Sequence, residues 1–216
     1  MKSILIIGLG QLGYHLALKM TELGNFVVVV DNNEDRIEEH VSEFSDAQIG
    51  DCTNEAVLRA IGVRNFDICF VTIGENFQSS LVVTMLLKKC GAKYIVAKAS
   101  QDVQVELLKT IGADEVIFPE RELSEKLAMR YNAENIFDYI PLTDEYSIYE
   151  IPIKPEWEGH TVMKIDVRRK YKINIVAVKR DGVLNPVPGG DYVFSKNDHL
   201  VVIGKSSDVF KLTAKI

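Results

Sequence analysis

The sequence predicts an α/β protein in which a doubly wound parallel sheet is followed by a smaller α+β module. Apolar runs of strand length alternate with segments of helical period through the first part of the chain, and short turns separate them. Strands that are covered on both faces read as continuous apolar runs. Strict alternation of strands and helices implies parallel pairing. From about Pro119 the pattern changes, which predicts a second part of different class.

The first part contains six apolar runs with helical segments between them. The expected strands are Ser3–Ile7, Phe26–Val30, Ala47–Ile49, Ile68–Thr72, Tyr94–Ala97 and Glu115–Phe118. The expected helices are Gln11–Leu23, Glu34–Phe44, Glu55–Ile61, Phe77–Lys89 and Val103–Ile111. In the first of these helices Leu12, Leu16 and Met20 share one face, which is typical of a helix that packs on a sheet.

The second part begins with one more helix, Pro119–Asn132, and continues with a segment, Ala133–Thr143, that shows no strong period. Three further strands and one short helix are expected after it: Ser147–Ile153, Ile173–Lys179, His199–Ile203 and the helical turn Val162–Ile165. We place the domain boundary near Leu142. The expected domains are residues 1–142, with the parallel sheet, and residues 143–216.

Composition excludes several classes of function. The 216 residues, 47% of them hydrophobic, are enough for one large core and a smaller one. A net charge of -6 disfavours binding to nucleic acid or to an anionic membrane surface. Three scattered cysteines without CxxC spacing favour reduced cytosolic thiols. No apolar run reaches membrane-spanning length, and the first strand leaves no room for a signal peptide, so a cytoplasmic protein is expected.

The stretch GLGQLG, residues 8–13, matches the GxGxxG pattern in the context that gives the pattern meaning. It follows a strand, opens a helix, and is followed about twenty residues later by Asp31 at the end of the next strand. Gly8 suits a tight turn, Gly10 lets a phosphate approach the backbone, and Gly13 lets helix and strand pack closely. Asp31 can accept hydrogen bonds from ribose hydroxyls and disfavours a 2′-phosphate. The pattern predicts a Rossmann-type nucleotide site; the alternative is a set of turn glycines with Asp31 capping the next helix.

Three later stretches also fall at the carboxyl ends of expected strands, where such sheets bind ligands. They are residues 50–53, residues 72–76 and Lys98, which are expected to line the adenine, the phosphates or ribose, and a phosphate, respectively. Loop capping and a solvated lysine are the structural alternatives. The full set expected to contact the nucleotide is Gly8, Gly10, Gln11, Leu12, Gly13, Asp31, Asn32, Arg36, Asp51, Cys52, Thr53, Ile73, Gly74 and Lys98.

Beyond these motifs, the chain resembles a known family. The stretches IIGLGQLG, VVVVD, IGDCTNEAVLRAIGVRNFDICFVTIGEN, IVAKAS, LLKTIGADEVIFPERE and DYIPLTDEYSIYEI are similar to the cytosolic regulatory subunits of Ktr/Trk-type potassium uptake systems, which have the RCK fold. The resemblance covers essentially the whole chain, and residues 143–216 resemble the TrkA-C domain. It implies that ATP, ADP or NAD(H) binds the first domain. It also implies homodimers that assemble into an octameric ring beneath a KtrB/TrkH-like membrane potassium channel or transporter.

The resemblance also suggests roles for individual residues. In many Ktr-type members an arginine that reaches the terminal phosphate of ATP occupies the position of Gln11, so discrimination between ATP and ADP is in doubt here. Glu120 matches an acidic position that helps to bind a divalent cation, Mg²⁺ or Ca²⁺, near the nucleotide; an ordinary first-turn acid is the alternative. Five further residues resemble a site for cyclic di-AMP between two C-terminal domains: Val162, Met163, Arg168, Ile173 and Asn174.

The competing function is that of an NAD(H)-dependent oxidoreductase or of a redox sensor with the same fold. Hydride transfer usually needs an acid or base within hydrogen-bond range of the substrate. None of His15, His40, His160 and His199 pairs with a carboxylate in a recognisable catalytic order. A transcriptional sensor would need a helix pair rich in lysine and arginine, which the acidic composition disfavours. The sequence therefore favours ligand binding without catalysis.

Overall fold

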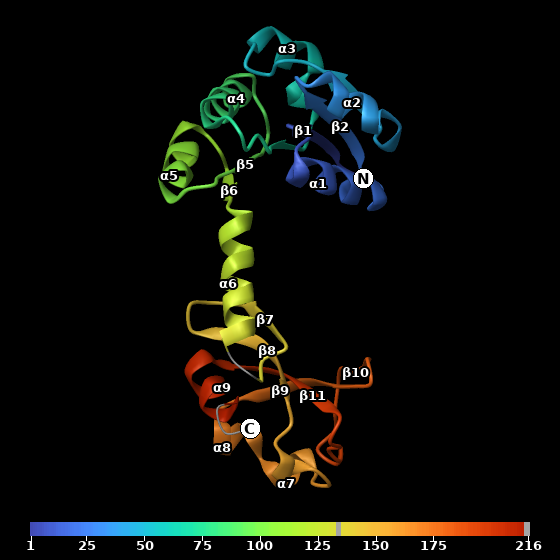
Figure 1. Ribbon diagram of the computed structural model, residues 1–216, viewed down its shortest axis with the longest axis vertical. Helices are drawn as coiled ribbons and strands as arrows, with labels where there is room; N and C mark the ends of the chain where they lie inside the picture. Colours follow the sequence, from blue (N-terminus) through green and yellow to red (C-terminus); the bar gives the residue numbers. More distant parts are fainter. Residues whose placement is uncertain (133–134, 214–216) are drawn as a thin grey trace. The chain divides into compact units, whose positions relative to one another are not determined.

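Six parallel strands form one sheet in the N-terminal part of the chain (Figure 1). The structure, a computed structural model, describes residues 1–132 and 135–213. The strands are β1 (Ser3–Ile7), β2 (Phe26–Asp31), β3 (Asp46–Ile49), β4 (Ile68–Val71), β5 (Ile95–Lys98) and β6 (Glu115–Ile117), in the spatial order β3-β2-β1-β4-β5-β6. The chain runs outward from β1 to β3 and returns to β4 on the other side of β1. Sheets of this order bind ligands at that reversal, outside the carboxyl ends of the strands.

Helices cover both faces of this sheet. They are α1 (Gln11–Glu22), α2 (Glu34–His40), α3 (Glu55–Ile61), α4 (Phe77–Lys89) and α5 (Asp102–Ile111). In β1, Leu5 and Ile7 join the core that α3, α4 and α5 complete. Ile4 and Ile6 join the core formed with α1 and α2 on the opposite face. Successive strand side chains point to opposite faces, so four consecutive positions of β1, Ile4 to Ile7, are apolar and buried. The expected doubly wound fold is confirmed.

A five-stranded antiparallel sheet forms the centre of the second compact unit. The two units comprise Met1–Glu120 and Arg121–Ile216. The strands are β7 (Asp138–Pro141), β8 (Tyr146–Pro152), β9 (Asn174–Arg180), β10 (Val183–Asn185) and β11 (Asp198–Lys205), in the order β10-β9-β11-β8-β7. Along β11 buried and half-exposed residues alternate. One face therefore supplies the core, which Tyr149, Leu200 and Val209 share with α7 (Val162–Ile165), α8 (Val167–Tyr171) and α9 (Ser206–Thr213).

The second unit contains more secondary structure than the sequence pattern predicts. Strand β7 lies in the segment without a strong period, of which residues 133–134 are outside the described residues, and it pairs with β8. The compact units therefore divide after Glu120, whereas the sequence boundary was placed near Leu142. The division of function between residues 1–142 and 143–216 stays a prediction.

Short or exposed elements escape a search for apolar period. All three residues of β10 are exposed, so β10 has no buried face to reveal it. Helices α8 and α9 were not expected either, and α2 ends at His40, before a 3₁₀ turn, instead of continuing to Phe44. Strand β10 and helix α8 are too short to show a recognisable repeat. Helix α9 is longer than α3, which the pattern predicts, and its buried Val209 and Leu212 have helical spacing, so its signal was present in the sequence.

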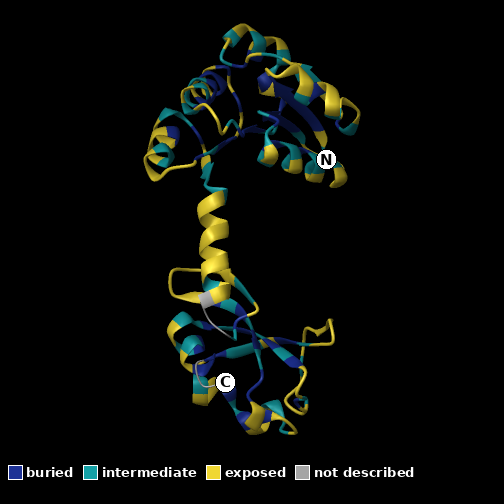
Figure 2. Ribbon diagram, viewed as in Figure 1, coloured by how far each residue is buried: buried dark blue, intermediate teal, exposed yellow. Residues whose placement is uncertain are grey.

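Helix α6 (Pro119–Asn132) begins with the last two residues of the first unit and is exposed along most of its length (Figure 2). Leu123, Leu127 and Tyr131 recur at intervals of four residues and are exposed. The sequence left open whether they serve the core or dimerisation. Their exposure shows that they are not part of the core of this chain.

Candidate nucleotide-binding site

The glycine-rich turn between β1 and α1 is held by close packing at two of its three glycines. Gly8 has a φ of +102°, and a Cβ there would lie 3.0 Å from the backbone nitrogen of Ile73. A Cβ at Gly13 would lie 2.0 Å from the Gly8 carbonyl oxygen and 2.7 Å from Thr72 Oγ1. A Cβ at Gly10, in contrast, would meet nothing within 4 Å. Gly8 and Gly13 are thus required by the fold, whereas Gly10 leaves an open approach to the backbone.

The first turn of α1 offers unsatisfied N–H groups at this approach. Its N-cap residue is Gly10, no side chain caps the helix, and its first turn contains no acidic residue. The initial N–H groups of a helix have no intrahelical acceptor and carry partial positive charge. Such groups are the kind of site at which helices bind anions such as phosphate.

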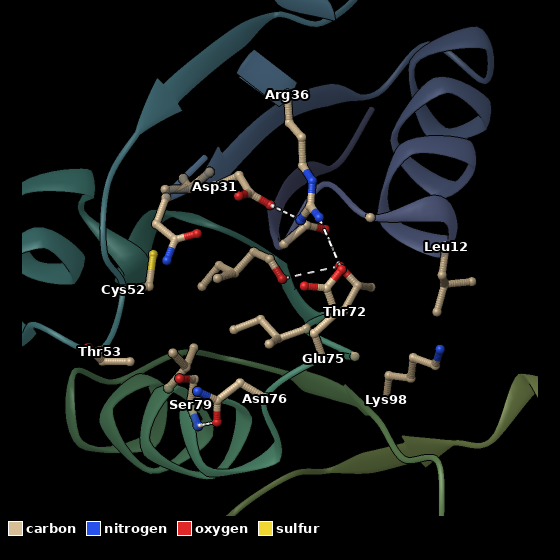
Figure 3. A pocket seen from close by; sticks show the side chains of 18 of the residues that line it. Leu12, Asp31, Arg36, Cys52, Thr53, Thr72, Glu75, Asn76, Ser79 and Lys98 are labelled. Atoms are coloured by element: carbon tan, nitrogen blue, oxygen red, sulfur yellow. Dashed lines mark hydrogen bonds and ion pairs between the residues drawn. The ribbon is translucent and has the colours of Figure 1, made fainter. Parts of the chain in front are cut away.

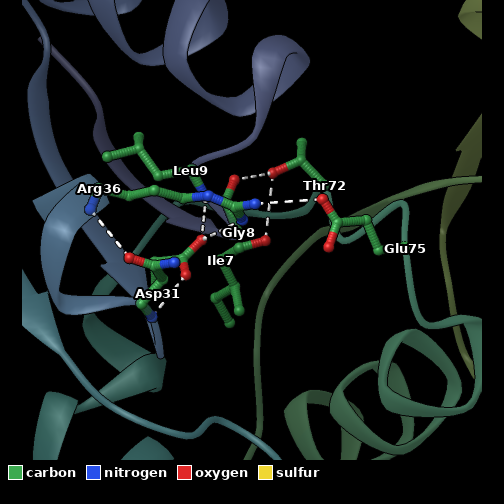
Figure 4. Close-up of polar contacts among 8 residues, drawn as sticks. Ile7, Gly8, Leu9, Asp31, Arg36, Thr72 and Glu75 are labelled. Carbon is green, nitrogen blue, oxygen red and sulfur yellow. Dashed lines mark hydrogen bonds and ion pairs between the residues drawn. The ribbon is translucent and has the colours of Figure 1, made fainter.

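Asp31 at the end of β2 connects the glycine turn to the start of α2 (Figure 4). Its carboxylate is 6% exposed and accepts hydrogen bonds from Leu9 N at 2.6 Å and Asn33 N at 2.8 Å. Arg36 Nη1 lies 3.7 Å from Asp31 Oδ2. The N-cap of α2 is Asn33, which accepts from the Arg36 N–H, so Asp31 is not itself the helix cap. Since a carboxylate has about four acceptor positions, Asp31 can still accept from a ribose hydroxyl.

The loop after β3 is also ordered by its own polar side chains. Asp51 accepts from the backbone N–H of Thr53 at 2.9 Å and from its hydroxyl at 2.7 Å, and these bonds lower the pKa of Asp51. Burial, with smaller contributions from Asp51 and Asp31, raises the pKa of Cys52 to about 12. The Cys52 thiol is therefore protonated at neutral pH and is not a nucleophile.

The loop after β4 closes the site on the side of α4. The Thr72 hydroxyl lies 2.6 Å from the Gly8 carbonyl oxygen, which joins this loop to the glycine turn. Asn76 caps α4 by accepting from the backbone N–H of Ser79. Both interactions fix the loop, and Thr72, Asn76 and Ser79 also line the cavity (Figure 3).

Two cationic side chains line the cavity, and each contacts carboxylates of the same cavity. Arg36 reaches Glu75 Oε1 at 3.1 Å as well as Asp31. Lys98 Nζ lies 2.5 Å from Glu120 Oε1, and its hydrogen bond lowers the pKa of the Glu120 carboxyl. A phosphate that approaches either cation has to compete with the carboxylates that already contact it.

All these loops surround one cavity of about 600 Å³ at the carboxyl ends of the strands. Of the residues expected from the sequence, the following line it: Gly8, Gly10, Gln11, Leu12, Asp31, Asn32, Arg36, Asp51, Cys52, Thr53, Ile73, Gly74, Lys98 and Glu120. Gly13 is the exception, because it lies where α1 packs on β1. The structure thus brings the predicted nucleotide residues together, and their role in binding stays a prediction.

Some lining residues were not singled out from the sequence. Ser79 lies in the first turn of α4 and Ser100 in the loop after β5. Their positions shortly after the carboxyl ends of strands could have indicated that they line the site. Ile7, Val30 and Val83 also line the cavity. These three residues follow the apolar pattern of the core, so nothing in the sequence distinguishes them from neighbouring core residues.

Glu120 has no cluster of companion metal ligands in the part of the chain that the structure describes. Among the described residues, no three His, Cys, Asp or Glu side chains gather in an arrangement that could hold a metal ion. Its carboxylate faces the Lys98 ammonium, a cation that would repel another. The cation role of Glu120 therefore does not fit a single chain and stays a prediction from the resemblance.

The five residues expected to bind cyclic di-AMP do not converge in the same way. Ile173 is 2% exposed and belongs to the core of the second unit, whereas Met163 is 72% exposed. Arg168 Nε donates to Asn174 Oδ1 at 2.7 Å, so these two polar groups satisfy each other. Val162 packs against the edge of the core. This second site stays a prediction.

None of the four histidines is among the described residues that line the cavity. His40 lies 2.9 Å from Glu43, and His199 lies 2.9 Å from Glu150, outside the cavity. The cavity is therefore suited to hold an adenine nucleotide through backbone N–H groups, a carboxylate and two cations. It does not present the histidine base that most proton transfers employ.

Comparison with known families and proteins agrees with this fold. The TrkA-N domain matches residues 4–119, and the TrkA-C domain matches residues 147–216. Ktr system potassium uptake protein C of Bacillus subtilis (strain 168) is 37% identical over 215 residues, covering 100% of this chain and 97% of the relative. Ktr system potassium uptake protein A of the same organism is 34% identical, with 96% and 94% covered.

A solved structure, that of the GsuK channel, shares the fold. It superposes with a TM-score of 0.72 at 23% identity over 98% of this chain and 38% of that one. Among the described residues of this chain, no helix combines the length and apolar character that are needed to cross a membrane. Two matched domains and full-length relatives above 30% identity make the relationship certain. This chain belongs to the family of TrkA-N/TrkA-C proteins that includes the Ktr system potassium uptake proteins.

Proposed function

We propose that this chain is a regulatory subunit that binds an adenine nucleotide and thereby controls a membrane-embedded potassium channel or transporter. The observation that carries the proposal is one cavity at the reversal of the strand order, bounded by the open backbone at Gly10 and the buried Asp31. Relatives named as potassium uptake proteins, similar over their full length, support the transport role. The ligands we propose are ATP, ADP or NAD(H).

Each part of such a ligand has a counterpart in the cavity. The N–H groups of the first turn of α1 suit a pyrophosphate, and Asp31 suits the ribose. Gln11, the first residue of α1, is neutral. It can form hydrogen bonds to a phosphate but adds no charge to distinguish ATP from ADP.

Regulation by a bound nucleotide follows from a difference in affinity. A ligand shifts a conformational equilibrium only by the difference between its affinities for the two states. We propose that those states belong to a homodimer that assembles into an octameric ring below the transporter, with the protein in the cytoplasm. The exposed residues Leu123, Leu127 and Tyr131 of α6 support a contact between copies, since exposed apolar stripes are often covered by a partner.

Calorimetric titration of the full chain with ATP, ADP, NAD⁺ and NADH tests the binding step. We expect heat of binding with at least one of them, and no binding by any of the four would contradict the proposal. Native mass measurement with and without these ligands tests the ring. A particle that stays monomeric in all conditions would remove the ring from the proposal.

Two further measurements separate the proposed function from its competitors. Capture of a KtrB/TrkH-like potassium transporter from membranes by the tagged chain is expected. Steady oxidation of NADH with a panel of keto acids, followed by absorbance, is not expected. Turnover there would favour the oxidoreductase.

A further inference from the structure

Lys98 and Glu120 form an ion pair inside the cavity. Lys98 is the last residue of β5, and Glu120 lies in the first turn of α6. Their charged atoms are 2.5 Å apart, and both residues line the cavity. The Lys98 side chain is 14% exposed and that of Glu120 57%, so the lysine is held within the site and the glutamate at its mouth.

The Lys98 ammonium also lies beside the loop after β4. A Cβ built on Gly74 would be 3.6 Å from Lys98 Nζ, so the ammonium passes close to this glycine. The other cation lining the cavity, Arg36, contacts Asp31 and Glu75. Both cationic side chains that line the described cavity are therefore neutralised by its own carboxylates.

A phosphate group at Lys98 would have to share the ammonium with Glu120. The ammonium has three donors in a compact charge, and two anions on it would lie only a few ångströms from each other. Like charges at such separation repel, and the repulsion is stronger where solvent is partly excluded. We propose that Glu120 is an internal competitor of the ligand, so that binding of a nucleotide phosphate displaces the Glu120 carboxylate from Lys98.

This inference rests on the proposed nucleotide binding and adds a regulatory step to it. Glu120 belongs to the first turn of α6, so its contact with Lys98 ties the start of that helix to the end of β5. Displacement of the carboxylate releases that tie. The occupied cavity and the empty cavity then differ in what holds the first turn of α6.

The variant Glu120→Gln tests the competition because it removes the charge and keeps the size. We expect the full-length variant to bind ADP about threefold to tenfold more tightly than the wild type in buffer that contains EDTA. The gain should be smaller for AMP, which has fewer phosphate charges. Calorimetry gives both affinities. Unchanged or weaker ADP binding by the variant in EDTA would overturn the inference.

Two matched variants control for net charge. Glu75→Gln removes a carboxylate from the same cavity, but its partner there is Arg36. Glu22→Gln removes the partner of Lys19 on the exposed surface of α1, where the two charged atoms are 2.7 Å apart. We expect Glu22→Gln to leave ADP affinity within about twofold. An equal gain in Glu22→Gln and Glu120→Gln would contradict a local competition.

A double-mutant cycle with Lys98→Met shows whether Glu120 acts through Lys98. Competition predicts that Glu120→Gln strengthens ADP binding in the wild-type background and changes it less than about twofold in the Lys98→Met background. If Glu120→Gln still strengthens ADP binding without Lys98, Glu120 repels the ligand directly, and the proposed competition for Lys98 is overturned. If ADP, ATP, NAD⁺ and NADH bind to neither wild type nor Glu120→Gln, the proposed function fails together with this inference.

Magnesium distinguishes competition from metal binding. If Glu120 binds a cation beside the phosphates, Glu120→Gln weakens ADP binding when Mg²⁺ is present and leaves it unchanged in EDTA. Competition predicts the gain in EDTA whatever Mg²⁺ does. The two roles of Glu120 are thus separated by whether Glu120→Gln gains affinity for ADP in the absence of metal.

Discussion

The two predicted ligand sites differ in how far one chain completes them. In the first unit, the loops after β1, β2, β3, β4 and β5 meet at one cavity, and nearly all expected residues line it. In the second unit, the expected residues are divided between the core, the exposed surface and a pair of mutually bonded side chains. A buried polar cluster there surrounds Asp198, which the sequence does not predict to bind a ligand.

The difference follows from sheet topology. Parallel strands place all their carboxyl ends at one edge, so residues far apart in sequence are brought to the same place. An antiparallel sheet alternates the direction of its strands, so residues near strand ends are distributed over both edges. A ligand site in the second unit therefore depends on local loops or on a second copy.

The greatest loss of stability is expected where close packing in the first unit is disrupted. Gly13→Ala introduces a Cβ 2.0 Å from the Gly8 carbonyl oxygen, which α1 and β1 cannot accommodate without moving apart. We expect the free energy of unfolding to fall by about 3 kcal/mol, measured by urea denaturation. Gly10→Ala is the matched control, since its Cβ meets no atom within 4 Å and its φ is −71°. Equal stability of Gly13→Ala and wild type would contradict the packing.

In the second unit, the corresponding test is the Asp198 cluster. The Asp198 side chain is fully buried and accepts from Arg180, Tyr192 and the backbone N–H of Ser195. Asp198→Asn is expected to lower the free energy of unfolding by about 2 kcal/mol. Glu145→Gln, which breaks the exposed pair with Lys205, should cost less than about 0.5 kcal/mol. Similar losses in both variants would mean that burial of the pair is unimportant.

The same cluster predicts an acid dependence. Burial alone raises the pKa of Asp198, but hydrogen bonds from Arg180, Ser195 and Tyr192 outweigh it and lower the pKa. A carboxyl with a lowered folded-state pKa contributes stability above its unfolded value of about 3.9, and this contribution is lost as the pH falls below that value. Wild type should therefore lose more stability than Asp198→Asn between pH 5 and the acid range, as followed by thermal melting. Parallel loss in both would contradict this origin.

A smaller change in free energy is expected at Gly10, where a substitution should weaken ligand binding more than it weakens the fold. Gly10→Val directs a side chain into the open approach to the α1 backbone. We expect affinity for the bound nucleotide to fall at least about tenfold, near 1.4 kcal/mol. The variant should stay folded and lose at most about 1 kcal/mol of stability without ligand, because valine is a poorer N-cap residue than glycine. Calorimetry and thermal melting measure the two. Undiminished binding by a folded Gly10→Val would place the phosphate elsewhere.

The smallest expected effect on stability is at the predicted second site. Arg168 is exposed and bonded to Asn174, so Arg168→Ala should change the free energy of unfolding by less than about 0.5 kcal/mol. If cyclic di-AMP binds as the resemblance suggests, equilibrium dialysis should show retention by the full chain and loss of retention in this variant. Lys172→Ala, another exposed cation nearby, is the control. Absence of retention by wild type would remove the second ligand alone.

The amino-acid pattern was enough to predict the doubly wound sheet and most of the residues that line the cavity. Continuous apolar runs such as that of β1 are needed where both faces of a strand are buried, and a glycine pattern is needed where α1 packs on β1. These requirements act on neighbouring positions, so they are visible as patterns. The match of both domains to this chain, together with the Ktr relatives, confirms the family that the motifs suggested.

Which charged groups face each other becomes apparent only in the folded structure. That Lys98 meets Glu120, that Arg36 lies between Asp31 and Glu75, and that Ile173 belongs to a core depend on contacts between distant segments. Strand β10 is likewise fixed by its pairing with β9, because its three exposed residues form no recognisable period. Hydrophobic periodicity is a local property of the chain, whereas the pairing of charges is set by where the folded backbone brings them.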